Sequence, residues 1–328
     1  MRTELQSLGK TNAITKLFDG SDYKNEYTTT LTEKGECCMA HKILLEGVDF
    51  DLTYTPLRHL GYKVVLCVIG ELYAKFYNPT SLSVNMGISS KFCYENIEEI
   101  WQGVLSAAKE HSIKHLSLDL NPSVNGLCLS LAACGVQKRG VLEMLPASKN
   151  MDLICLTDNV GAAYMGFHVL EREKVSFNKD SSKQPDLSKY KYILASYLSP
   201  EIHSDILNRF TDAEIYPSKG YFITKGLATS VIQLTRDTQM GAKIYIEKIP
   251  LSSHTFEMAE EINMDAITAA LNGGDDYRFI FTVPIEKHDA FRKEFHDYDI
   301  IGHLAKPEVG HVLITPEGAE IEIKAQGY

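Results

Sequence analysis

The sequence has little that points to nucleic acid, to membranes or to secretion. Acidic residues outnumber basic ones, so the 328-residue chain has a formal net charge of −10 and a pI of about 5.6, and it lacks a basic surface for nucleic acid. No apolar run is long enough to span a bilayer, and residues 1–20 lack the apolar core of a signal peptide. We therefore expect a cytoplasmic protein with no nucleic-acid partner and no membrane partner.

Cysteine and histidine lack the spacing of disulfide or metal sites. The seven cysteines are odd in number, include no Cys-x-x-Cys pair and lie mostly in apolar stretches, which favours reduced core residues. The eleven histidines show no metal-ligand spacing. Hydrophobic residues make up 44% of the chain, which is enough for the cores of two ordinary domains.

Apolar periodicity predicts strands and helices in the first half. Residues 80–89 alternate apolar and polar side chains as a half-buried strand does, and residues 95–110 place apolar side chains on one helical face. Residues 114–120 and 126–134 predict two further strands. Residues 57–76 predict a mostly apolar helix, whose apolar width suggests burial on more than one side, as at an interface.

The second half also alternates strands and helices, which makes both halves α+β. We place the domain boundary near residues 145–152, giving an N-terminal domain of residues 1–148 and a C-terminal domain of residues 149–328. Within the second domain, the polar, turn-rich residues 174–190 predict a loop, and residues 225–239 predict a strongly patterned helix.

One short stretch, "ALNGGDDYRFIFTVP" at residues 269–283, combines two glycines, two acids and a predicted strand. Glycine permits the positive-φ backbone of a tight turn. Asp275 and Asp276, which follow the glycines, are placed to hold a cation or a polar ligand. The simpler alternative is a turn with two solvated acids.

Four stretches of the chain, taken in order, resemble thiamine-monophosphate kinase, a family in the superfamily that includes aminoimidazole ribonucleotide synthetase. They are "LLEGVDFDLTYTPLRHLGYK" (44–63), "DNVGAAYMGFHVLEREK" (158–174), "MAEEINMDAITAALNGGDDYRFIFTVP" (258–283) and "IGHLAKPEVG" (301–310). The resemblance runs from about residue 44 to the C-terminus, and residues 1–40 match poorly.

The resemblance implies a two-domain α+β fold of the aminoimidazole ribonucleotide synthetase-like type, whose N-terminal domain forms a homodimer. It also implies that ATP, Mg²⁺ and thiamine phosphate bind in a cleft, where the γ-phosphoryl group of ATP passes to thiamine monophosphate. Such a transfer depends on positioning and on cations that neutralise the phosphate oxygens, so the family gathers aspartates around magnesium.

Several metal-holding positions of the family are changed in this sequence. The family's Gly-Asp-Asp loop has no equivalent in residues 23–39, and Lys42 stands where the family has an aspartate. The family's Asp-Ile-Ser-Asp-Gly-Leu becomes "FITKGL", which places Phe222 and Lys225 at the two aspartate positions. Each exchange of aspartate for lysine changes the local charge by two units, which disfavours a divalent cation.

Other family positions are kept in part. Glu71 and Asp119 correspond to two of the family's acidic metal-binding positions, and we interpret them as remnants of its magnesium site. The resemblance places Lys42, Lys225 and Asn159 on the phosphate side, and it places the thiamine side on the residues that survive best: Asp275, Asp276, Tyr277 and the terminal Tyr328.

Two interpretations of the lysines remain open. Lys42 and Lys225 either pair with surviving acids such as Asp119 or Glu71, or they stand where metal ions stood and bind a phosphate directly. Three functions follow: a catalytically weak or silent protein that binds a nucleotide or thiamine phosphate, an active kinase with a rebuilt metal site, or a non-catalytic partner, for example in a heterodimer with an intact kinase.

Overall fold

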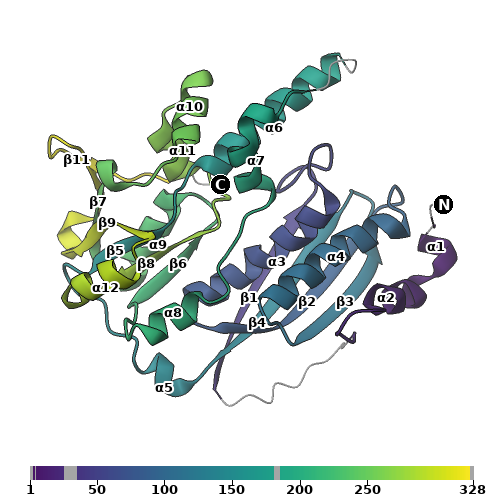
Figure 1. The fold of residues 1–328 in the computed structure, drawn as a ribbon, viewed down its shortest axis with the longest axis horizontal. Coiled ribbons are helices and arrows are strands. Elements are labelled where there is room, and N and C mark those ends of the chain that lie inside the picture. The colour runs from purple at the N-terminus through teal and green to yellow at the C-terminus, as the bar shows by residue number, and fades with distance from the viewer. Residues whose placement is uncertain (1–2, 4, 26–34, 181–184, 326–328) are drawn as a thin grey trace. The chain divides into compact units, whose positions relative to one another are not determined.

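The computed structural model describes residues 3, 5–25, 35–180 and 185–325 (Figure 1). The chain folds into two compact units, each with its own sheet and helices, so the predicted two-domain α+β fold is confirmed.

Unit 1 comprises residues 1–139 and unit 2 comprises residues 140–328. The short helix α5 (Arg139–Leu142) lies at this division. The boundary predicted from the sequence, at residues 148/149, falls a few residues later.

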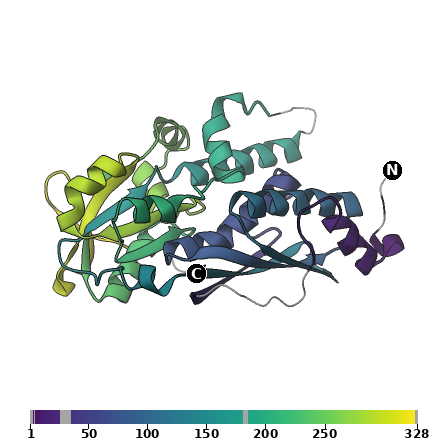
Figure 2. The ribbon, with the colours of Figure 1, turned by 60° about the horizontal axis from the view of Figure 1, so that its bottom comes forward.

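Unit 1 is a layer of helices on a four-stranded sheet. Its elements are α1 (Leu5–Leu8), α2 (Lys10–Phe18), β1 (Glu36–Leu45), α3 (Leu57–Ala74), β2 (Asn78–Ile88), α4 (Tyr94–Glu110), β3 (His115–Pro122) and β4 (Cys128–Gln137). The strand order is β1–β4–β2–β3; the first two pairs are antiparallel, and β2 and β3 are parallel because α4 connects them. Helices α3 and α4 lie on one face of the sheet (Figure 2).

Helix α3 is buried within unit 1 by the sheet on one side and by α4 on the other. The two helices cross at glycines: a β-carbon on Gly61 would lie 1.8 Å from the Ile100 carbonyl oxygen, and one on Gly103 would lie 2.0 Å from the Arg58 carbonyl oxygen. A single chain therefore already explains the apolar width of this helix, and no second chain is needed to cover it.

Unit 2 is built on a seven-stranded sheet. Its elements are β5 (Leu153–Thr157), α6 (Ala162–Lys179), η1 (Ser188–Tyr190), α7 (Lys191–Leu198), α8 (Ile206–Asp212), β6 (Lys219–Ile223), α9 (Leu227–Thr238), β7 (Gly241–Tyr245), η2 (Ile246–Lys248), α10 (Ser253–Glu261), α11 (Ala266–Asn272), β8 (Arg278–Val283), η3 (Ile285–Lys287), α12 (His288–Glu294), β9 (Tyr298–Ala305), η4 (Pro307–Val309), β10 (His311–Ile314) and β11 (Glu320–Glu322). The strand order is β11–β10–β7–β9–β5–β8–β6.

The two faces of this sheet have different cores. One face packs on α9 and α11 through aliphatic side chains such as Ile223, Leu227 and Val231. The other face packs on α8 and α12 through phenylalanines: the Phe210 ring lies 5.0 Å from Phe281 and 4.6 Å from Phe295, between ring centroids. Burial of each such side chain contributes about 1.5–3 kcal/mol to stability.

The loop predicted for residues 174–190 is wrong over part of its length. Helix α6 continues to Lys179, and residues 188–190 form η1. Residues 174–179 contain neither glycine nor proline to end the helix, and the Lys174 ammonium pairs with Glu171 one turn earlier at 3.1 Å. Polarity alone was therefore a poor signal for a loop.

The structure contains no membrane-spanning helix in the residues it describes, since none of those helices is both long enough and apolar enough to cross a bilayer.

Candidate functional site

Three loops of unit 2 meet at one edge of its sheet. Strand β8 lies between β5 and β6 and is antiparallel to both, so the ends of β5 and β6 lie beside the start of β8. The loops that connect these strand ends to helices are residues 158–161, 224–226 and 273–277. The stretch with two glycines and two acids is the third of them.

Backbone hydrogen bonds join the second loop and the third. The Asp275 amide donates to the Thr224 carbonyl oxygen at 3.0 Å, and the Tyr277 amide donates to the Ile223 carbonyl oxygen at 3.0 Å. Asp275 and Tyr277 have positive φ angles of 57° and 54°, as does Asp158 in the first loop at 55°. Such conformations cost energy in residues other than glycine and cluster at functional sites.

Helices α6 and α9 both begin at this edge with a glycine N-cap. Gly161 and Gly226 each have a φ of 84°, and neither N-cap has a side-chain hydrogen bond. Both glycines pack on the last turn of α11: a β-carbon would lie 3.2 Å from the Ala270 nitrogen at Gly161 and 2.3 Å from the Leu271 carbonyl oxygen at Gly226. Two helix N-termini, which attract anions, are thus placed around one short segment.

Asp276 ties the third loop to the start of α6. Its side chain is buried, and its Oδ1 accepts a hydrogen bond from the Gly161 amide at 2.7 Å. Its other oxygen, Oδ2, has no partner among the described residues. Burial outweighs that hydrogen bond and the nearby Arg278 charge, and raises the pKa of Asp276 to about 8. The carboxyl group is therefore mostly protonated at pH 7.

Comparisons with known proteins find thiamine-monophosphate kinases as relatives of this chain. No model of a known protein family matches the chain. Thiamine-monophosphate kinase of Buchnera aphidicola subsp. Acyrthosiphon pisum (strain APS) is 24% identical over 294 residues, which cover 87% of this chain and 84% of the relative. Thiamine-monophosphate kinase of Bacillus subtilis (strain 168) is 20% identical over 292 residues, covering 87% and 85%.

Solved structures share the fold across both units. Thiamine monophosphate kinase from Aquifex aeolicus matches with a TM-score of 0.73 at 20% identity, covering 98% of this chain and 100% of that one. AaThiL complexed with AMPPCP and TMP matches with the same TM-score and identity, covering 99% and 97%. Hydrogenase maturation protein HypE in complex with ATP matches with a TM-score of 0.67 at 12% identity, covering 97% and 93%.

These relatives and solved structures confirm the resemblance to thiamine-monophosphate kinases and to the aminoimidazole ribonucleotide synthetase-like fold that the sequence indicated.

The family's phosphate-side positions in unit 2 can now be located. Lys225 is exposed and immediately precedes the N-cap of α9. Asn159 lies in the first loop, where its amide nitrogen donates to Asp158 Oδ1 and to the Tyr192 hydroxyl, both at 2.7 Å. The structure thus brings Lys225, Asn159, Asp275, Asp276 and Tyr277 into the three loops of one sheet edge.

Phe222, at a family aspartate position, is part of the core. Its side chain is buried at the end of β6, with the Tyr277 ring centroid at 5.4 Å and the Phe279 ring centroid at 5.0 Å. Tyr277, predicted on the thiamine side, is itself buried. An aromatic cluster therefore stands where the family resemblance places a metal-holding carboxylate.

In unit 1, the two acids interpreted as remnants of a magnesium site, Glu71 and Asp119, lie apart from each other. Glu71 on α3 lies 3.4 Å from the Lys42 ammonium on β1, at Oε1. Side chains alternate between the two faces of a strand, and Leu118 and Leu120 on either side of Asp119 lie on the buried face with Val84 and Met86 of β2. Asp119 therefore lies on the opposite face of the sheet from α3 and α4.

Asp119 has a different cationic partner, which the sequence did not reveal. The Lys10 ammonium on α2 lies 2.5 Å from its Oδ1, and this contact lowers the pKa of Asp119. Glu71 and Asp119 thus lie on opposite faces of the sheet, each beside a lysine, and they do not fit a shared magnesium site. Among the described residues, no group of three or more His, Cys, Asp and Glu side chains is arranged to hold a metal ion.

Two site residues remain to be placed, Tyr328, which the sequence analysis named, and Gly161, which it did not. Tyr328 lies outside the described residues. Gly161, which sequence reasoning did not single out, forms the N-cap of α6 and binds Asp276. A glycine followed by the alanines and apolar residues of 162–170 was the available signal, since glycine is favoured where φ is positive.

Proposed function

We propose that this protein binds a phosphate-bearing ligand, a nucleotide such as ATP or a thiamine phosphate, where α6 and α9 begin, and that it is weak or silent as a kinase. The ligand class rests on the family, in which AaThiL has been solved with AMPPCP and TMP. The binding position rests on the two glycine-capped helix N-termini that pack on the last turn of α11.

Lys225 supports a phosphate site that needs no metal. It is an exposed cation one residue before the N-cap of α9, so its charge adds to the positive end of the helix. Lysine binds phosphate as a point charge. In the family, the same position carries an acid that works with magnesium.

The weak or silent catalysis rests on three positions. Lys42 places a cation beside Glu71, Lys10 places one beside Asp119, and Phe222 is buried in an aromatic cluster. An active kinase with a rebuilt metal site is the competing proposal. It would need magnesium to be held by other acids of the chain.

Lys225→Asp should weaken the binding of thiamine diphosphate or ATP at least about tenfold, because it replaces an attraction for phosphate by a repulsion. The wild-type melting temperature should rise with either ligand, and the rise should be equal in magnesium and in EDTA. Lys219→Asp is the matched control, since it makes the same charge change at the far end of β6. If Lys225 only neutralises nearby acids, neither ligand will raise the melting temperature of the wild type, and Lys225→Asp will lower the stability of the protein without affecting ligand binding.

We also propose a homodimer, paired through the face of the unit 1 sheet that points away from α3 and α4. The opposite face of this sheet is not available for such an interface, since Leu82, Val84 and Met86 of β2 are 2%, 0% and 0% exposed in one chain. On β1, by contrast, Met39 is 74% exposed and Ile43 is 60% exposed. Apolar side chains so exposed on one strand suit a protein partner.

Ile43→Glu should convert the dimer, of mass near twice 36.7 kDa, into a monomer, because it places a charge in the apolar centre of the proposed interface. Light scattering over micromolar concentrations measures the mass. Val175→Glu is the control, since Val175 is an exposed valine on α6 in unit 2. A wild-type monomer would contradict the homodimer, and an unchanged dimer in Ile43→Glu would contradict this choice of surface. Association with an intact kinase, but not with itself, would favour the heterodimer.

A further inference from the structure

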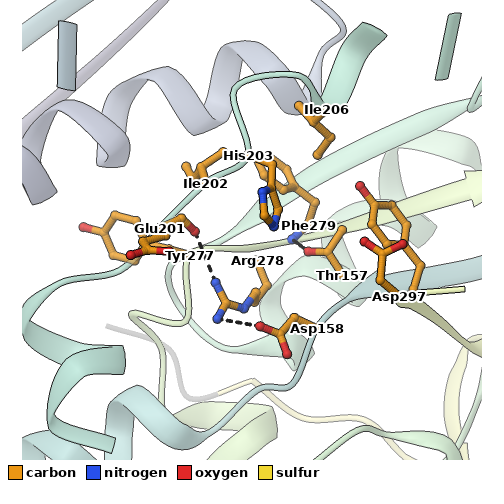
Figure 3. Close-up of a pocket in the computed structure, with 11 residues that line it drawn as sticks. Thr157, Asp158, Glu201, Ile202, His203, Ile206, Tyr277, Arg278, Phe279 and Asp297 are labelled. Carbon is orange, nitrogen blue, oxygen red and sulfur yellow. Dashed lines mark hydrogen bonds and ion pairs between the residues drawn. The ribbon is translucent and has the colours of Figure 1, made fainter. Parts of the chain in front are cut away.

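A cavity in unit 2 and the exposed sheet face of unit 1 differ in charge. The cavity, of about 280 Å³, lies beside the end of β5 and the start of β8 (Figure 3). Two of its acids, Asp158 and Asp297, pair with Arg278 at 2.9 Å and with Arg209 at 2.6 Å, so neither needs a ligand to balance it. The sheet face of unit 1 has almost no charge to balance, and the proposed homodimer pairs through it.

The outer face is the side of the unit 1 sheet that points away from α3 and α4. On β1 it consists of every second residue from Cys37 to Leu45, and it continues across β4, β2 and β3, because residues directly opposite one another in a ladder share a face. Its residues on the two central strands are mostly small, and they include Ser130, Ala132, Ser81, Ser83 and Gly87. Small side chains let a second sheet pack closely on this face.

Charged side chains are nearly absent from the outer face. They make up 23% of the chain, yet Asp119 on β3 is the only Asp, Glu, Lys or Arg that the described strands place there. Its charge is matched by Lys10 of α2 at 2.5 Å. A face without unmatched charge meets a copy of itself without like-charge repulsion, and interface cores are depleted of charge. A second copy of this chain is therefore the partner that the outer face fits.

His41 lies in the middle of the exposed apolar part of the outer face. It is an exposed residue of β1 between Met39 and Ile43, and it lies opposite Ala132 of β4. Within the described residues, its imidazole has no hydrogen bond and no ion pair. No acid lies beside it on β1 or β4 on this face. An interface centred on Met39 and Ile43 therefore buries this imidazole without an acid that would hold a proton on it.

The other titratable side chains of the outer face are farther away or are thiols. His115 and Asp119 lie on β3, at the opposite edge of the sheet from β1. The cysteines of the face are Cys37, Cys128 and Cys134, and thiols in water carry no charge in the acid range. His41 is thus the group on β1 and β4 that can gain a charge on this face as the pH falls.

We propose that His41 makes the homodimer sensitive to pH, so that two copies pair while this imidazole is neutral and separate when it takes up a proton. The inference rests on the homodimer proposed above. Histidine in water has a pKa of about 6.5, and burial without an acid favours the neutral form. Two free chains thus bind more protons than the dimer, so a fall in pH favours the free chains. Two-fold symmetry buries two such histidines in each dimer.

Sedimentation velocity over a dilution series, at pH 8.0 and at pH 6.0, measures the dissociation constant of the dimer. This constant should be about tenfold larger at pH 6.0, because each dimer that forms must release the protons of two histidines. Both pH values lie above the pI of about 5.6. The net negative charge is smaller at pH 6.0, and weaker repulsion between chains would tighten the dimer, so the expected change has the opposite sign to this general effect.

Variants then assign the pH dependence to His41. His41→Gln should keep the dimer and lose the pH dependence, since glutamine is neutral at both pH values. His41→Lys, which places a permanent charge in the interface, should weaken the dimer at both. His115→Gln is the matched control, because His115 lies on the same face, and it should keep the wild-type pH dependence.

The outcomes separate this inference from the homodimer itself. A wild-type monomer at pH 8.0 would overturn the homodimer and the role of His41 with it. A wild-type dimer with the same dissociation constant at both pH values would overturn the role of His41 alone. Persistence of the pH dependence in His41→Gln, or its loss in His115→Gln, would do the same.

Discussion

Asp276→Asn should stabilise the protein at pH 8 by on the order of 3–5 kcal/mol relative to wild type, and it should have almost no effect near pH 4. Asparagine has the shape of a protonated aspartic acid, and its carbonyl oxygen can still accept the hydrogen bond from the Gly161 amide. The substitution therefore keeps the contact and removes the titration.

The sign follows from the pKa of Asp276, which burial raises to about 8 in the folded chain. An unfolded aspartate has a pKa of about 3.9, so between these values the folded state binds one proton more than the unfolded state. Wild-type stability should thus fall as the pH rises from about 4 to about 8 and should level off above that. The Asp276→Asn variant lacks this dependence on pH, so its stability relative to wild type grows as the pH rises.

Urea denaturation of both proteins across this pH range measures the effect. Asp275→Asn is the matched control, because it removes the neighbouring, half-buried carboxylate. It should keep most of the wild-type slope, since burial is the largest cause of the raised pKa of Asp276 and the Asp275 charge only a smaller one. A constant difference between Asp276→Asn and wild type from pH 4 to pH 8 would show that Asp276 is ionised in the fold.

The second large effect concerns catalysis. Purified protein with magnesium-ATP and thiamine monophosphate should turn over below about 0.01 per second, at least a hundredfold below the roughly 1–100 per second of kinases. The reason is that Lys42, Phe222 and Lys225 stand at the positions where the family resemblance places metal-holding aspartates.

A coupled assay of ADP release measures this rate. An active thiamine-monophosphate kinase, run in parallel, shows that the assay detects the reaction. Product formed within the kinase range would favour the rebuilt metal site and would contradict the silent interpretation.

Much of the fold followed from the sequence, because long periodic segments are dominated by local pattern. The alternation of Leu82, Val84 and Met86 predicted β2, and the apolar face that includes Trp101 predicted α4. The resemblance then supplied the two-domain fold to which these elements belong. Helix α2 was missed, since its burial depends on a tertiary contact, with the Phe18 ring centroid 4.9 Å from that of Trp101.

The site was harder to predict because its properties are tertiary. The sequence placed Asp276 beside a turn but could not show that it is buried against Gly161. It offered Asp119 or Glu71 as partners for the lysines; the structure places Lys42 beside Glu71 and Lys10 beside Asp119. Such pairings join residues far apart in the chain, and only the three-dimensional fold decides them.

Calorimetric titration of the wild type with thiamine diphosphate and with ATP, in magnesium and in EDTA, tests the central claim most directly. That claim is that protein cations, and not a metal ion, hold the phosphate-bearing ligand at the start of α6 and α9. At least one of the two ligands should bind with the same dissociation constant in both buffers. Binding that requires magnesium would contradict the claim, and so would the absence of binding by either ligand.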